Sequence, residues 1–87
     1  MAKMIVEHKV EDFGKWKSVF DSLAPVHRQF GLTDAQVYQG NGKPNDVVVV
    51  THWGSNDQAK KWSQSPELKD AMQKAGVAGP PNIYFVD

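Results

Sequence analysis

The chain has 87 residues, no cysteine, and ten basic against ten acidic side chains, so its formal net charge is zero when the histidines are neutral. This length fits one small domain spanning residues 1–87, and the lack of cysteine excludes disulfides, thiolate metal ligands and thiol nucleophiles. The charges are interspersed and the longest apolar run is Val47–Val50, so we expect no nucleic-acid partner, no membrane span and a cytoplasmic location.

The first half of the chain predicts a strand followed by a broken helix. Apolar side chains alternate from Met4 to Val10, which is typical of a strand, and Asp12 is suited to cap a helix. Pro25 interrupts the helical pattern and predicts a kink or break at residues 22–24, and Gly31 is suited to end the helix. The apolar stripe of this helix recurs at steps of three and four residues and comprises Phe13, Trp16, Phe20, Leu23, His27 and Phe30.

The second half predicts a hairpin, a second helix and a last strand. Residues 35–39 alternate as a strand and lead through the turn formers of residues 40–45 into Val47–Trp53, which is apolar at both parities and therefore predicts a central strand. We expect a hairpin loop longer than the minimum. A helix follows over residues 57–75, with a fresh start at Ser65-Pro66 and an end at Gly76. Residues 79–81 predict a rigid connector to a strand at 83–86.

This order of elements, β-α-β-β-α-β, predicts an α+β, ferredoxin-like fold. Two right-handed crossovers that flank a hairpin give a four-stranded antiparallel sheet of order 4-1-3-2, with both helices on one face. The other face still presents apolar side chains from the central strand. Because exposed apolar area forfeits about 25 cal/mol per Å², we expect a homodimer that buries this face against an identical sheet.

Three segments resemble a known family: His8–Lys17, Pro44–Val49, and Ser65–Met72 continuing to Ala75–Val77. They are similar to small bacterial proteins of the dimeric α/β-barrel superfamily, of the antibiotic-biosynthesis-monooxygenase-like or cyclase-like type. The resemblance implies a pocket between helices and sheet, and an activity such as cofactor-independent oxygenation or cyclisation of aromatic, polyketide-like molecules. Its haem-degrading branch implies a histidine on the second helix, which is lacking here, so we expect no haem and no other cofactor.

Within such a pocket, Trp16, Phe20, Trp62, Met72 and Val48 are the expected lining. Aromatic side chains suit a flat ligand such as a phenol or quinone. His8 and Tyr84 are the candidate catalytic pair: His8 would take a proton from the ligand, while Tyr84 and Trp16 position it. Each of these residues has a purely structural alternative, because aromatics at helical spacing usually form core and His8 shares a strand face with Val6 and Val10.

The other histidines predict little chemistry. His27 fits a helix-end position where the dipole favours the cation, and His52 fits a partly exposed strand end. These two are the only histidines expected at the same end of the sheet, and two ligands without a carboxylate make a weak site, so we expect no metal. Arg28 is a possible anion contact. Three functions stay open: an enzyme, a non-catalytic binding or stress-associated protein, and a purely structural dimer with a filled interior.

Overall fold

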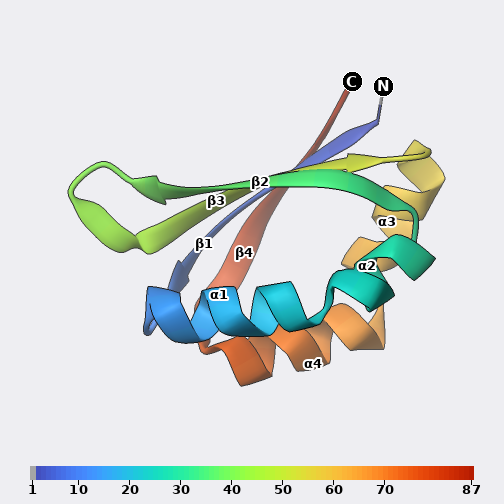
Figure 1. Cartoon of the computed structure of the whole chain (residues 1–87). Helices are drawn as coiled ribbons and strands as arrows, with labels where there is room; N and C mark the ends of the chain where they lie inside the picture. Colours follow the sequence, from blue (N-terminus) through green and yellow to red (C-terminus); the bar gives the residue numbers. More distant parts are fainter. Residues whose placement is uncertain (1) are drawn as a thin grey trace.

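The computed structural model describes residues 2–87 and has the predicted α+β architecture, with one sheet and helices packed on one of its faces (Figure 1). Residues 2–87 form four strands and four helices in the order β-α-α-β-β-α-α-β. Their bounds are β1 Lys3–Val10, α1 Phe13–Ser22, α2 Ala24–Gln29, β2 Leu32–Gly40, β3 Lys43–Trp53, α3 Asn56–Ser63, α4 Pro66–Ala75 and β4 Val77–Val86.

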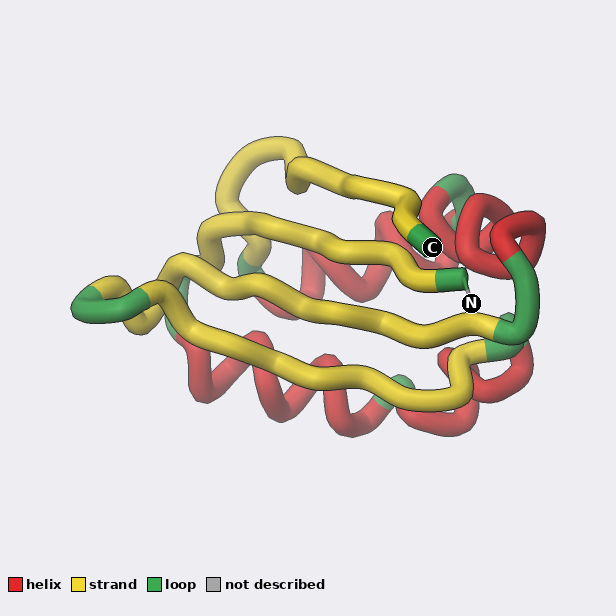
Figure 2. The backbone as a smooth tube through the Cα atoms, turned by 90° about the horizontal axis from the view of Figure 1, so that it is seen from above, coloured by secondary structure: helices red, strands yellow, loops and turns green. Residues whose placement is uncertain are grey.

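The strand order is β2-β3-β1-β4 and every neighbouring pair is antiparallel. This is the predicted order 4-1-3-2, counted from the other edge. In the register, His8 lies opposite Val47, and Met4 lies opposite Thr51 on one side and Phe85 on the other. Figure 2 looks onto the uncovered face of this sheet, with the helices behind it.

Each predicted helix is present as two shorter helices. The first breaks at Leu23, and Pro25 then lies in the first turn of α2, where its missing N–H costs nothing. The second breaks between α3 and α4, and the Ser65 hydroxyl accepts the Leu68 N–H as the N-cap of α4. Asp12 caps α1 in the same way through the Lys15 N–H. Gly76 ends α4 at φ 74°, a left-handed conformation that favours glycine.

Three boundaries differ from the prediction. Strand β2 begins at Leu32, three residues before the predicted start at residue 35. The ladder of the β2–β3 hairpin continues to the pair Gly40 and Lys43, so the turn is only Asn41-Gly42, with Gly42 at φ 71°, and the longer loop was wrong. The residues before Val47 predicted a loop, yet Lys43–Asp46 extend β3, with the first three of them exposed. The predicted connector was also wrong: β4 begins at Val77 and includes Pro80 and Pro81, which an edge strand tolerates.

Alternation along the strands divides the sheet into two faces. The face under the helices, called the helix face here, carries Met4, Val6 and His8 from β1 and the side chains opposite them. The other, called the open face, has no element of this chain over it (Figure 2). It presents Ile5, Glu7, Tyr38, Val48, Val50, His52 and Tyr84.

The buried side chains between the helix face and the helices form two clusters. One comprises Val10, Trp16, Val47, Val49 and Ala75. The other comprises Met4, Trp53, Ala59 and Trp62. The core is therefore split along the strands.

No helix within residues 2–87 has the length and apolar character needed to cross a membrane.

Candidate functional site

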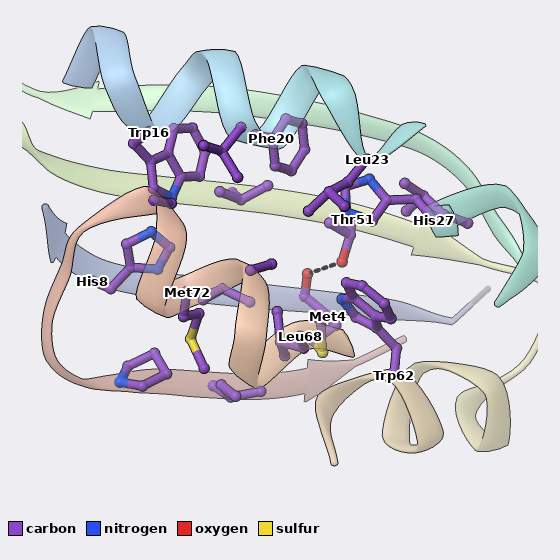
Figure 3. Close-up of a pocket in the computed structure, with 18 of the residues that line it drawn as sticks. Met4, His8, Trp16, Phe20, Leu23, His27, Thr51, Trp62, Leu68 and Met72 are labelled. Carbon is purple, nitrogen blue, oxygen red and sulfur yellow. Dashed lines mark hydrogen bonds between the residues drawn. The ribbon is translucent and has the colours of Figure 1, made fainter. Parts of the chain in front are cut away.

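A cavity of about 70 Å³ lies between the two core clusters and is lined by members of both. Strands β1 and β3 form its floor, and helices α1, α2, α3 and α4 supply the opposite wall (Figure 3). Its lining is almost wholly apolar or aromatic. The residues around it include Met4, Val6, His8, Trp16, Val19, Phe20, Leu23, His27, Leu32, Val49, Thr51, Trp53, Trp62, Leu68, Ala71, Met72, Ala75, Pro81 and Ile83.

His8 is the buried polar side chain of this cavity that has no partner. It projects from the helix face of β1 and is only 9% exposed. Neither Nδ1 nor Nε2 forms a hydrogen bond with any other group of residues 2–87. A buried polar group without a partner costs about 1–3 kcal/mol, so its retention needs an explanation. Burial also lowers the pKa of His8 below its ordinary value of 6.5, because the charged form is penalised in an apolar surrounding.

A continuous series of ring contacts forms one wall of the cavity. The ring of His8 lies 5.5 Å from Trp16, which stacks on Phe20 at 5.1 Å. Phe20 in turn lies 5.0 Å from His27, which meets Trp62 edge-on at 5.1 Å. Such arrangements contribute about 0.5–1.5 kcal/mol per pair beyond simple burial. The wall is therefore a fixed surface that a flat ligand can pack against.

His27 is the main site residue that sequence reasoning missed. It is only 6% exposed and lines the cavity, where the prediction had a helix-end histidine without a role in the pocket. Burial lowers the pKa of His27, so the expected preference for the cation at a helix C-terminus was wrong, since desolvation dominates. One signal was available in the sequence, because His27 falls on the apolar stripe of the first helix.

The remaining polar atoms of the cavity lining near Thr51 already have partners. The Thr51 hydroxyl donates to the Met4 carbonyl oxygen at 2.6 Å, the bond drawn dashed in Figure 3, and it accepts the indole N–H of Trp53 at 2.8 Å. The first bond joins β3 to β1 beneath the cavity, and the second lies within β3. Because the Thr51 hydroxyl and the Trp53 indole N–H already form hydrogen bonds, neither is available to bond to a ligand.

The structure brings together five of the seven predicted site residues. His8, Trp16, Phe20, Trp62 and Met72 all line the cavity (Figure 3). The other two lie on the open face, beyond the sheet. Tyr84 pairs with Ile5 and is 51% exposed, so it does not approach His8 within one chain. Val48 pairs with Glu7 and Tyr38. Both expectations were wrong about the face, because neighbouring residues of a strand point in opposite directions.

His52 lies on the open face as well, where its Nε2 is 2.9 Å from the Gln36 Oε1. It is therefore on the opposite side of the sheet from His27, and the one histidine pair considered for a metal does not form. Within residues 2–87 there is no group of three or more histidine, aspartate and glutamate side chains that could hold a metal ion.

A shallow groove adjoins the cavity between the α1–α2 break and strand β2. Its volume is about 220 Å³, and it shares Phe20, His27 and Leu32 with the cavity. Arg28 lies at this groove with Asp21 and Asp34, so the anion contact considered for Arg28 faces two carboxylates. The ring of His27 thus forms part of the wall between the cavity and a surface groove.

Comparison with known proteins agrees with this fold. The family model for antibiotic biosynthesis monooxygenase matches residues 6–74. A Bordetella bronchiseptica protein assigned as an antibiotic biosynthesis monooxygenase is similar in structure, with a TM-score of 0.83 and 14% identity over 99% of this chain and 94% of that one. SnoaB, a cofactor-independent oxygenase from Streptomyces nogalater, has a TM-score of 0.74 and 14% identity, over 99% and 92% of the two chains. No protein with a curated description matches the chain.

Proposed function

Because the chain belongs to the antibiotic biosynthesis monooxygenase family, we propose that it binds a small aromatic molecule in its cavity and oxygenates it without a cofactor. The observation that supports this most is the imidazole of His8, which is buried in an aromatic cavity with both ring nitrogens unpartnered. A residue kept at such a cost fits a role toward a ligand better than a role in packing.

In this proposal His8 is the general base. Its lowered pKa keeps the imidazole neutral near pH 7, so one nitrogen is free to accept a proton from a phenolic hydroxyl of the ligand. The apolar lining excludes water and favours a delocalised anion. Trp16 and Phe20 would hold the ring flat against the wall, and Trp62 would close the far side.

The reaction balances with the ligand as the only reductant. His8 removes a hydroxyl proton, and the resulting anion gives electrons to dioxygen. One oxygen atom forms a bond to a ring carbon that loses its hydrogen, and the O–O bond breaks to release the other atom as water. A hydroquinone supplies the further two electrons by becoming a quinone, so hydroquinone and dioxygen give a hydroxyquinone and water.

We propose the homodimer as the form in which this site operates. Tyr38 and Tyr84 are 55% and 51% exposed on the open face, beside Ile5, Val48 and Val50. No helix covers this face (Figure 2), and a second copy with the same surface would cover it about a two-fold axis. Tyr84 belongs to that interface in this proposal, and the sheet separates it from the cavity.

Oxygen uptake tests the proposed activity. Purified protein would be mixed with a panel of phenols and hydroquinones in an oxygen-electrode cell, beside His8→Ala and the control His52→Ala on the opposite face. We expect uptake with at least one hydroquinone. His8→Ala should lower the rate about a hundredfold or more, as loss of a general base usually does, and His52→Ala should not. An undiminished rate in His8→Ala would remove the proposed base.

A non-catalytic binding protein is the second candidate. The observation in its favour is that the cavity walls offer few polar groups besides the histidines. In that case a hydroquinone would bind in the cavity, and no oxygen would be consumed above the rate of its spontaneous oxidation. A filled, purely structural interior is disfavoured by the cavity itself.

A further inference from the structure

The cavity has an imidazole at each of its two ends. His8 projects from β1 at one end and His27 from α2 at the other, with Trp16 and Phe20 along the wall between them (Figure 3). Successive rings along this wall are separated by 5.5, 5.1 and 5.0 Å. Because the two imidazoles lie at opposite ends of the cavity in Figure 3, a ligand that lies along the wall has one of them beyond each end.

Both imidazoles are in a state to bond to a neutral ligand. His8 is 9% and His27 is 6% exposed, and burial lowers the pKa of each. A neutral imidazole has one nitrogen that donates and one that accepts. The ring of His27 contacts those of Phe20 and Trp62 at centroid distances of 5.0 and 5.1 Å. In contrast, Thr51 and Trp53 are already bonded.

We propose that the cavity selects a single-ring arene with hydroxyl groups at opposite ends, a 1,4-dihydroxyarene, and that His27 determines this specificity by binding the hydroxyl farther from His8. This inference rests on the ligand site of the proposed function, although it does not depend on oxygenation. It also makes His27 the hydrogen-bond partner of the second hydroxyl of the hydroquinone.

The size of the cavity favours one ring. A buried apolar cavity of about 150 Å³ holds a benzene molecule, whereas this one measures about 70 Å³. A single ring therefore fits only if some of the lining side chains move. Met72 is unbranched and adapts readily, and Leu23 and Leu68 are only half-buried. Fused-ring ligands would require a much larger rearrangement of the stacked wall.

The three isomers of dihydroxybenzene have the same atomic composition and differ only in the position of the second hydroxyl. They therefore test where the cavity binds that hydroxyl. Hydroquinone, resorcinol and catechol carry two hydroxyls in 1,4, 1,3 and 1,2 positions, and phenol carries one. Their dissociation constants would be measured by calorimetric titration under strict exclusion of oxygen, so that no turnover contributes. For the unmodified protein we expect hydroquinone to bind about three- to tenfold more tightly than phenol, the usual net effect of one hydrogen bond, with catechol close to phenol.

The variant His27→Phe keeps an aromatic ring between Phe20 and Trp62 and removes both nitrogens. We expect it to bind phenol as before and to lose the preference for hydroquinone. His27→Gln, which restores a donor and an acceptor, should recover part of that preference and serves if the phenylalanine variant does not fold. A merely structural role of His27 would change all four dissociation constants together.

Three results would overturn the inference: an equal preference for hydroquinone in His27→Phe, equal binding of catechol and hydroquinone by the unmodified protein, or no binding of any of the four. Failure of the proposed oxygenation is separate, because it would appear as normal isomer selection without oxygen uptake. Oxygen uptake with every phenol and no isomer preference would remove this inference alone.

Discussion

The imidazole of His8 packs against the indole of Trp16, with ring centroids 5.5 Å apart and planes inclined at 54°. Trp16 is itself stacked between Phe13 and Phe20, at 5.9 and 5.1 Å. His8 is therefore held by aromatic contacts and not by hydrogen bonds, which leaves its nitrogens available to a ligand. If His8 served packing alone, a side chain of similar shape without the two nitrogens would make the fold more stable.

The variant His8→Phe tests whether the unpartnered imidazole lowers the stability of the folded protein. Phenylalanine keeps the ring contact with Trp16 and removes two buried nitrogens that have no partner, so we expect the free energy of unfolding to rise by about 1 kcal/mol. Denaturation in urea would measure it. The same change at His52 loses the contact with Gln36 and should not stabilise. A marked loss of stability in His8→Phe would mean that the imidazole is bonded in the folded protein.

The pH dependence of stability follows from the two buried histidines. Their pKa values are lowered in the folded protein, so the unfolded chain binds more protons as the pH falls through 6.5, and stability is lost on acidification. Above the unfolded value the full stability is present. We expect the thermal midpoint to be nearly constant between pH 7 and 8 and to decrease below about pH 6.5.

The double variant His8→Phe, His27→Phe is the control for that pH effect. Its thermal midpoint should change much less between pH 7 and 5 than that of the unmodified protein. An equally steep decrease in the double variant would assign the acid sensitivity to other groups.

Local signals in the sequence predicted the elements well because each depends on neighbouring residues. Asp12 and Ser65 cap helices as predicted, Pro25 follows the break in the first helix, and Gly76 ends the last one. Such caps act within one turn of the chain. The strand order followed from the sequence of elements and the handedness of crossovers.

The faces of the strands were harder to predict. Val47–Val50 is apolar at both parities, so nothing local distinguishes Val49, which faces the cavity, from Val48, which does not. Tyr84 and Ile83 pose the same ambiguity. A one-residue error in parity moves a side chain to the other face of the sheet. The burial of His27 depends on where α2 packs, which is a property of the tertiary structure.

The proposed dimer is tested at the centre of the open face. Val50 lies between Ile5 and Gln36 there, and in a two-fold dimer Val50→Asp would bury two like charges close together. We expect the unmodified protein to sediment as a dimer at micromolar concentration and Val50→Asp to sediment as a monomer, because unpaired buried charge costs several kcal/mol. Ser18→Asp, on the exposed side of α1, should remain dimeric. A monomeric unmodified protein would contradict the prediction.

Filling the cavity separates a binding site from an imperfectly packed core. Ala71 projects from α4 into the cavity and is 8% exposed, so Ala71→Leu would occupy part of its roughly 70 Å³. Added apolar contacts in a void should raise the free energy of unfolding by about 0.5–2 kcal/mol, while the affinity for hydroquinone should fall at least tenfold. The matched variant Ala78→Leu, on the exposed part of β4, should change neither quantity much. If Ala71→Leu binds hydroquinone normally, the ligand does not occupy this cavity, and the position of His8 and His27 at its ends has no bearing on recognition.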